Sequence, residues 1–298
     1  MSDLTYLQSV VIGALQGVTE LFPVSSLGHS VLVPAFIGGS WEHLVNESST
    51  STSAESPYLA FIVALHVATA VALLIFYRSD WARIIRAFVT TVRTRRIETS
   101  SERLAWLIIT ATIPVGITGL ALEHPLRTLF AKPLAAAVFL TLNGVILLGG
   151  ERLRRHTTKT PPAGALVVAR RRGLDDLRYR EAGVVGLFQS LALLAGISRS
   201  GITMVAGLLR GLDHEDAARF SFLLATPVIL AAGVLKLPSL AGSVGDGIHG
   251  QVLVGALVAG CCAYGAVRFL SRYFATHSLT PFAIYSMVAG VVCIARFA

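Results

Sequence analysis

The residues best suited to chemistry lie in a short polar stretch of an otherwise apolar chain. Between positions 16 and 29 the sequence places an acid, two hydroxyls, an imidazole and an amide: Glu20, Ser25, Ser26, His29 and Gln16. Gln16 and Glu20 are four residues apart and therefore share one face of a helix. A proline and a glycine in the stretch predict a turn on which the serines and the histidine converge. The residue types predict acid–base or nucleophilic chemistry.

A second polar stretch, far along the chain, has the composition of an anion receptor. Positions 196–203 read Gly-Ile-Ser-Arg-Ser-Gly-Ile-Thr, which supplies one guanidinium, three hydroxyls and two glycines. A guanidinium beside free backbone N–H groups at a helix start suits phosphate oxygens. The candidate anion-binding residues are Ser198, Arg199, Ser200, Gly201 and Thr203. Together the two stretches predict cleavage of a phosphate ester or anhydride.

Structural roles are the alternative for each of these residues. Arg199 could pair with Glu20, His29 could bond a backbone carbonyl, and serines favour close helix packing in membranes. Ionisable residues at membrane depth usually serve function, and their clustering favours chemistry. His66 also interrupts an apolar segment, and its role stays open between lining a cavity and bonding a neighbouring helix.

The elements that must position these residues are membrane helices. The chain has 298 residues, 54% hydrophobic and 14% charged, with a mean hydropathy of +0.68. Soluble proteins average about 25% charged residues. Six apolar segments are long enough to span a bilayer, at 58–77, 104–123, 132–150, 216–236, 251–270 and 278–297.

Two further apolar segments, 4–38 and 181–211, contain the polar stretches and are broken by Gly, Ser and, in the first, Pro. Irregular backbone at membrane depth is tolerated where it is buried or lines a cavity, so we expect two re-entrant helix hairpins at a site. We therefore predict an all-α, polytopic membrane protein with six transmembrane helices and two such hairpins.

The basic residues predict orientation. The net charge is +8, and the segments 78–103 and 151–180 carry sixteen of the 25 Lys and Arg residues. This is the positive-inside pattern of cytoplasmic loops. Nucleic-acid binding is not expected, because no recognisable binding module accompanies the charge. The loop 39–57, which has three Glu and no Lys or Arg, is expected outside.

The two broken segments also predict an internal repeat. At an offset of 173 residues, six positions of the first segment, including Gln16, Ser25 and Gly28, are identical in the second. The halves would have opposite orientation, as in inverted-topology repeats. We expect a single membrane domain, 1–298, made of repeat 1 (about 1–150), a cytoplasmic linker (151–180) and repeat 2 (181–298).

At these motifs the chain resembles the undecaprenyl-diphosphate phosphatase family, the integral-membrane enzymes associated with bacitracin resistance. The matching residues are Gln16, Glu20, the Pro-Val-Ser-Ser-x-Gly-His run at 23–29, and 196–201. Leu27, Ala195 and Ile202 depart from the usual pattern. The resemblance covers essentially the whole chain and implies the same fold.

The resemblance implies hydrolysis of undecaprenyl diphosphate, a phosphoric anhydride, to undecaprenyl phosphate, which recycles the lipid carrier of cell-wall synthesis. Glu20, Ser26, His29 and Arg199 would be catalytic, and Gln16, Ser25, Ser198 and Thr203 would support phosphate or metal binding. A divalent cation, Mg²⁺ or Ca²⁺, would be held by Glu20 and Gln16. The nucleophile stays open among Ser26, His29 and water.

The expected partners are a polyprenyl diphosphate lipid and membrane lipids, with homo-oligomerisation left open. The expected location is the bacterial plasma membrane, with the active site opening to the external face. The alternative function is transport or flipping of polyprenyl phosphate lipids, because broken helices around a midplane anion site also describe transporters.

Overall fold

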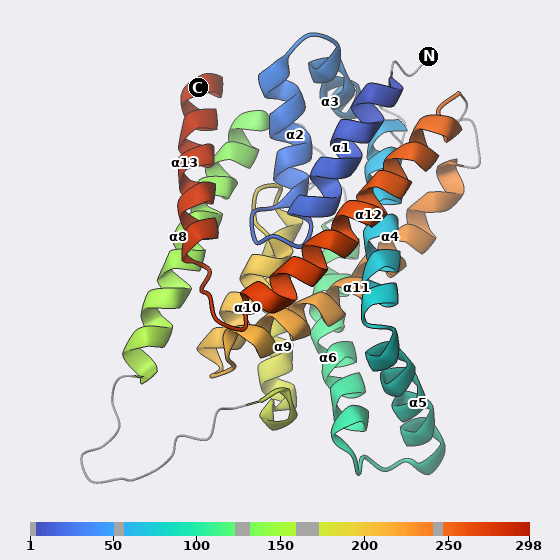
Figure 1. Cartoon of the computed structure of the whole chain (residues 1–298), viewed down its shortest axis with the longest axis vertical. Helices are drawn as coiled ribbons and strands as arrows, with labels where there is room; N and C mark the ends of the chain where they lie inside the picture. The colour runs from blue at the N-terminus through green and yellow to red at the C-terminus, as the bar shows by residue number, and fades with distance from the viewer. Residues whose placement is uncertain (1–3, 51–56, 123–131, 159–172, 241–246) are drawn as a thin grey trace.

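The computed structural model describes residues 4–50, 57–122, 132–158, 173–240 and 247–298, and its regular structure in these ranges is helical (Figure 1). In chain order the α-helices are α1 (Tyr6–Thr19), α2 (Ser26–Ile37), α3 (Ser40–Thr50), α4 (Pro57–Phe76), α5 (Arg78–Thr94), α6 (Ser100–Ala121), α8 (Pro133–Thr158), α9 (Tyr179–Ser190), α10 (Arg199–Leu209), α11 (His214–Leu240), α12 (His249–Tyr273) and α13 (Thr280–Phe297). Two short 3₁₀ helices, η1 (Leu174–Asp176) and η2 (Leu191–Leu193), flank α9.

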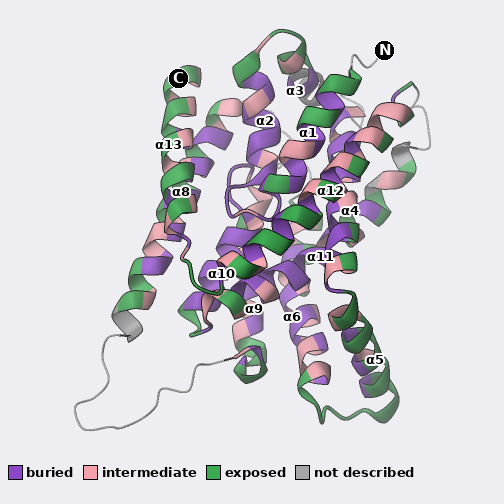
Figure 2. Ribbon diagram, in the orientation of Figure 1, coloured by how far each residue is buried: buried purple, intermediate pink, exposed green. Residues whose placement is uncertain are grey.

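Six of these helices, α4, α6, α8, α11, α12 and α13, are long and apolar enough to cross a membrane. They coincide with the six predicted spans, so the chain is an all-helical, multi-pass membrane protein. Their outward faces carry exposed Leu, Ile and Val side chains, for example Ile117, Leu120 and Leu257 (Figure 2). Apolar surface of this kind suits hydrocarbon rather than water.

Two segments that the sequence suggested as loops contain helices. Part of the expected external loop forms α3, while residues 51–56 lie outside the described ranges. The expected basic loop 78–103 contains α5, which buries Ile84, Ala87 and Thr91 on one face and exposes most of its arginines. Its apolar residues recur at helical spacing between the charges, so the helix forms by packing that face. Residues 159–172 of the expected linker lie outside the described part of the chain.

Both predicted breaks are present, each as a short non-helical segment between two helices. Glu20–Ser25 separates α1 from α2, and Leu194–Ser198 separates η2 from α10. The second helix of each pair begins in the same way, because the Ser25 and Ser198 side chains accept hydrogen bonds from the N–H groups of Gly28 and Gly201. Ser25 has φ +70°, a strained left-handed conformation for a residue with a side chain.

Small residues let the helices around these breaks approach closely. A Cβ on Gly13 of α1 would lie 2.4 Å from the carbonyl oxygen of Gly255 on α12. A Cβ on Gly186 of α9 would lie 2.4 Å from the carbonyl oxygen of Ala111 on α6. Helix pairs in membranes rely on such contacts because lipid gives no hydrophobic drive to association. The first helix of each broken pair, α1 or α9, therefore packs through a glycine on the backbone of a spanning helix, α12 or α6.

Candidate active site

The two breaks meet inside the molecule (Figure 1). The backbone N–H of Gly196 donates to Ser25 Oγ at 3.1 Å, and Ser200 Oγ donates to the Phe22 carbonyl at 3.3 Å. Asn143 on α8 links them further, since its Nδ2 donates to the Pro23 carbonyl at 3.0 Å and its Oδ1 accepts from Ser198 N at 2.9 Å. Segments more than 170 residues apart therefore form one buried unit.

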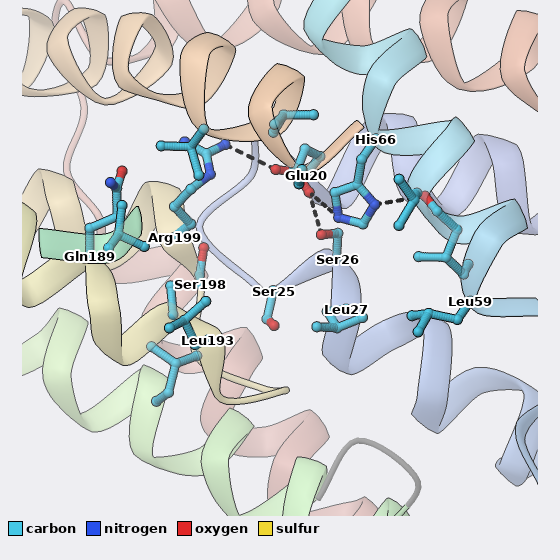
Figure 3. A pocket seen from close by; sticks show the side chains of 18 residues that line it. Glu20, Ser25, Ser26, Leu27, Leu59, His66, Gln189, Leu193, Ser198 and Arg199 are labelled. Atoms are coloured by element: carbon cyan, nitrogen blue, oxygen red, sulfur yellow. Dashed lines mark hydrogen bonds and ion pairs between the residues drawn. The ribbon is translucent and has the colours of Figure 1, made fainter. Parts of the chain in front are cut away.

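A cavity of about 290 Å³ lies beside this unit (Figure 3). Its polar lining residues are Glu20, Ser25, Ser26, His66, Gln189, Ser198 and Arg199. The rest of the lining is apolar and comes mostly from α4, α6, η2 and α11, including Ile62, Val115, Leu193 and Val228. The cavity thus combines a charged end with apolar walls, as sites for amphipathic ligands do.

Glu20 is the centre of the charged end. Its Oε1 accepts from Arg199 Nη2 at 3.0 Å, and its Oε2 lies 2.5 Å from Ser26 Oγ, 3.1 Å from Gln16 Nε2 and 3.2 Å from His66 Nε2. The Glu20 side chain is 5% exposed. A buried carboxylate requires this degree of pairing to remain charged.

The two ring nitrogens of His66 both face oxygen acceptors, and an imidazole that donates to both of them is protonated and positively charged. Its Nδ1 faces the Ile62 carbonyl at 2.8 Å and its Nε2 faces the Glu20 carboxylate. Both oxygens are acceptors, so each nitrogen needs a proton to donate. One carboxylate then faces a guanidinium and an imidazolium, which leaves the charged end with a positive balance suited to a phosphate.

Ser26 is the hydroxyl best placed to react. It is the first residue of α2, lines the cavity and donates a hydrogen bond to Glu20 Oε2. A hydroxyl bonded to a carboxylate has a built-in acceptor for its proton when the oxygen attacks. Arg199 is held at the opposite oxygen of the same carboxylate, and its guanidinium has the geometry that suits a phosphate.

His29 does not line this cavity and contacts neither Glu20 nor Ser26 among the described interactions. Its Nδ1 is 2.7 Å from the Ser25 carbonyl, and its Nε2 is 2.8 Å from the Tyr285 hydroxyl of α13. The rings of His29 and Tyr285 stack at 5.8 Å. The expected convergence of His29 on the serines is thus replaced by a contact that holds the strained Ser25 backbone.

The other predicted site residues do not line the cavity and instead hydrogen-bond to residues around it. Gln16 bonds Glu20 but is absent from the lining. Ser200 bonds Ser198 at 3.0 Å, Gly201 donates its N–H to Ser198 Oγ, and Thr203 Oγ1 donates to Ser221 Oγ on α11 at 2.6 Å. These residues order the second break. Of the ten predicted residues, Glu20, Ser25, Ser26, Ser198 and Arg199 reach the cavity itself.

Sequence reasoning left the role of His66 open and gave none to Asn143 and Gln189, and the structure places all three at the site. His66 reaches Glu20, Asn143 bridges the two breaks, and Gln189 lines the cavity. Each is a lone polar side chain in an apolar segment, which is the one sequence signal they carry.

A metal site is not built by protein side chains alone within the described ranges. They contain no group of three or more His, Cys, Asp or Glu residues able to hold an ion. Gln16 Oε1 is a buried acceptor without a hydrogen-bond partner there, and it neighbours the Glu20 carboxylate through the same amide. Two oxygen donors fit part of a Mg²⁺ or Ca²⁺ shell, which needs about six in total.

Comparison with known proteins gives a consistent result along the whole chain. A family model described as bacitracin resistance protein BacA matches residues 9–292. "Undecaprenyl-diphosphatase 2" of Frankia alni is 65% identical, over 100% of this chain and 99% of the relative. "Undecaprenyl-diphosphatase" of Mycolicibacterium paratuberculosis is 58% identical, over 97% and 96%, and "Undecaprenyl-diphosphatase 2" of Chromobacterium violaceum is 43% identical, over 96% of each.

Proposed function

Because the chain belongs to the bacitracin resistance protein BacA family, we propose that it hydrolyses undecaprenyl diphosphate to undecaprenyl phosphate and inorganic phosphate. The observation that carries the proposal is the contact of Ser26 with Glu20 and of Glu20 with Arg199 at the end of an apolar cavity. The alternative, transport of intact lipid, requires an anion site but no paired hydroxyl and carboxylate. The names of the relatives lend it no support.

The chemistry follows from the two oxygens of Glu20. Ser26 Oγ attacks the terminal phosphorus while its proton passes to Glu20 Oε2, and the bond between that phosphorus and the bridging oxygen breaks. Undecaprenyl phosphate leaves and takes that proton from Glu20, and the phosphate stays on Ser26. Water then attacks the phosphorus and gives one proton to Glu20, the bond between the phosphorus and Ser26 Oγ breaks, and Glu20 returns the proton to Oγ as inorganic phosphate leaves. Arg199 and His66 offset the charge on the phosphate oxygens throughout.

The apolar walls suit the polyprenyl tail. Residues from α4, α6, η2 and α11 present aliphatic side chains to the cavity, including Leu59, Val63 and Ile229. A tail on these walls would keep the diphosphate at the charged end. The contacts between the tail and these walls then position the reacting phosphorus near Ser26, so that binding energy from the tail lowers the activation barrier of hydrolysis.

A re-entrant, inverted-repeat architecture is the arrangement we propose for the two halves. At the offset of 173 residues, Gly13 corresponds to Gly186, and each packs on the spanning helix of the other half, α12 and α6. The serine caps of α2 and α10 correspond in the same way. Repeat 1 would cover about 1–150 and repeat 2 181–298, joined by a cytoplasmic linker.

The bacterial plasma membrane, with the cavity opening externally, is the location we propose. In Figure 1, α3 and the C-terminus lie at one end of the molecule and the arginine-rich α5 at the other. The cavity is lined by the beginning of α4 and the second half of α11, which lie toward the α3 end. Placing α5 in the cytoplasm follows the positive-inside rule.

A divalent cation is a further part of the proposal. Glu20 and the free Gln16 Oε1 would hold it, with substrate phosphates or water completing its shell. When bound, Mg²⁺ or Ca²⁺ neutralises part of the diphosphate charge.

Phosphate release from undecaprenyl diphosphate by the purified full chain in detergent tests the proposal, with and without a chelator. We expect release, and a lower rate with chelator that added cation restores. Intact lipid crossing vesicles without phosphate release would contradict hydrolysis and favour transport.

A further inference from the structure

Gln189 has the environment of a ligand-binding residue rather than a structural one. It lies near the end of α9, is 0% exposed and lines the cavity. Neither Nε2 nor Oε1 of its amide has a hydrogen-bond partner among the described residues. A buried amide without partners is strongly unfavourable, so native structures seldom keep one unless it meets a further group.

The internal repeat explains why this amide is free. Gln189 corresponds to Gln16 at the offset of 173 residues, and Gln16 satisfies its Nε2 by donating to Glu20 four residues later. The position corresponding to Glu20 is Leu193, which has no acceptor. The second half thus has the glutamine but, four residues later, an apolar residue that also lines the cavity.

The location of Gln189 indicates what its partner would be. Figure 3 shows Gln189 toward the end of the cavity where Arg199 and Ser198 lie, with Glu20, Ser26 and His66 toward the other. Arg199 uses one guanidinium nitrogen on Glu20 and another on the Ser221 carbonyl. A neutral amide, with N–H donors on Nε2 and an acceptor at Oε1, suits a phosphate group that has both ionised and protonated oxygens.

We propose that Gln189 binds the diphosphate of the substrate, as a contact that Arg199 and Ser198 do not supply. The identity of the ligand rests on the proposed function. The binding of a phosphate group by the Gln189 amide can be tested without it. Because the amide contacts the bound phosphate before and during reaction, its removal weakens binding more than it slows the chemical step.

The test compares Gln189→Leu with the wild-type full chain in detergent, using inorganic pyrophosphate and magnesium as the probe. Leucine removes the unpartnered amide and keeps much of its volume. We expect an unliganded melting temperature equal to or above that of wild type. The pyrophosphate concentration that gives half of the thermal stabilisation should rise about ten- to hundredfold, the range expected for a hydrogen bond to a charged group.

Turnover provides the second measurement. With undecaprenyl diphosphate, Gln189→Leu should raise KM by a similar factor while changing kcat little. Gln189→Glu, equal in size but negatively charged, should weaken pyrophosphate binding further. Thr226→Val is the matched control, because Thr226 Oγ1 is also buried and unpartnered but Thr226 does not line the cavity. It should leave the pyrophosphate response unchanged.

Each outcome decides the inference. Gln189→Leu with a lower melting temperature, or failing to fold, would overturn it by showing a structural partner for the amide. Unchanged pyrophosphate binding would overturn it too. If wild type binds pyrophosphate through Gln189 but releases no phosphate from the lipid, the proposed function fails while the phosphate-binding role stands.

Discussion

Replacing the Glu20 carboxylate by an amide should separate catalysis from phosphate binding. Glu20→Gln preserves shape and lets Gln16 and Ser26 keep a hydrogen bond to the remaining carbonyl oxygen. It removes the charge that faces Arg199 and His66, and with that charge the base that takes the Ser26 proton during attack. We expect kcat to fall about 10²–10⁴-fold, the contribution of a positioned general base.

The same substitution has a calculable effect on stability. The Glu20 and Arg199 side chains are 5% and 12% exposed, so the pair has little contact with solvent. Removing one partner of a buried ion pair costs about 3–5 kcal/mol, because the other charge is left uncompensated. Pyrophosphate would supply a new anion for Arg199 and His66, so it should stabilise Glu20→Gln more than it stabilises wild type.

Phosphate release at several lipid concentrations, together with thermal unfolding, measures both effects. Glu151→Gln is the control: Glu151 is equally buried and accepts from His214 Nε2 at 2.5 Å and Leu279 N at 2.8 Å, outside the cavity lining. It should lower the melting temperature while the folded protein keeps wild-type kcat. A Glu20→Gln variant with at least a third of wild-type kcat would refute the role of Glu20 as base.

Four further variants test His66, which contacts Glu20, and the His29–Tyr285 contact beside the first break. His66→Ala should raise KM about tenfold, because one positive partner of the site is lost, and His66→Gln should recover part of this through its amide donor; wild-type KM in His66→Ala would exclude a role in binding. His29→Ala should lower kcat about tenfold by releasing the Ser25 backbone, and Tyr285→Phe should do less since His29 keeps its Ser25 contact. Complete loss in His29→Ala with an unchanged melting temperature would instead favour His29 as nucleophile.

The sequence could predict the helices and the breaks because these depend on local composition. Apolar length defined the six spans, and the Pro, Gly and Ser residues marked the two interruptions. The pairing of Arg199 with Glu20 was named from the sequence as the structural alternative to a catalytic role, and the two side chains are in contact. The helical form of α5 could also have been recognised, since its buried residues recur at helical spacing.

Contacts that depend on how helices rotate against one another could not be predicted. His66 reaches Glu20 because of the way α4 faces the first break, and the sequence left this choice open. His29 turns to Tyr285, a residue 256 positions away, which no local spacing reveals. Gln16 has Glu20 four residues later and Gln189 has Leu193, a difference that matters once both side chains are known to be buried.

The central claim is that Ser26, with Glu20 as its base, takes the phosphate from the lipid diphosphate. Acid quenching of wild-type protein during turnover, followed by mass spectrometry of the peptide containing Ser26, tests it most directly. We predict phosphate on Ser26 in wild type, and neither phosphopeptide nor phosphate release in Ser26→Ala. Wild-type rates of phosphate release from a folded Ser26→Ala variant would contradict the account.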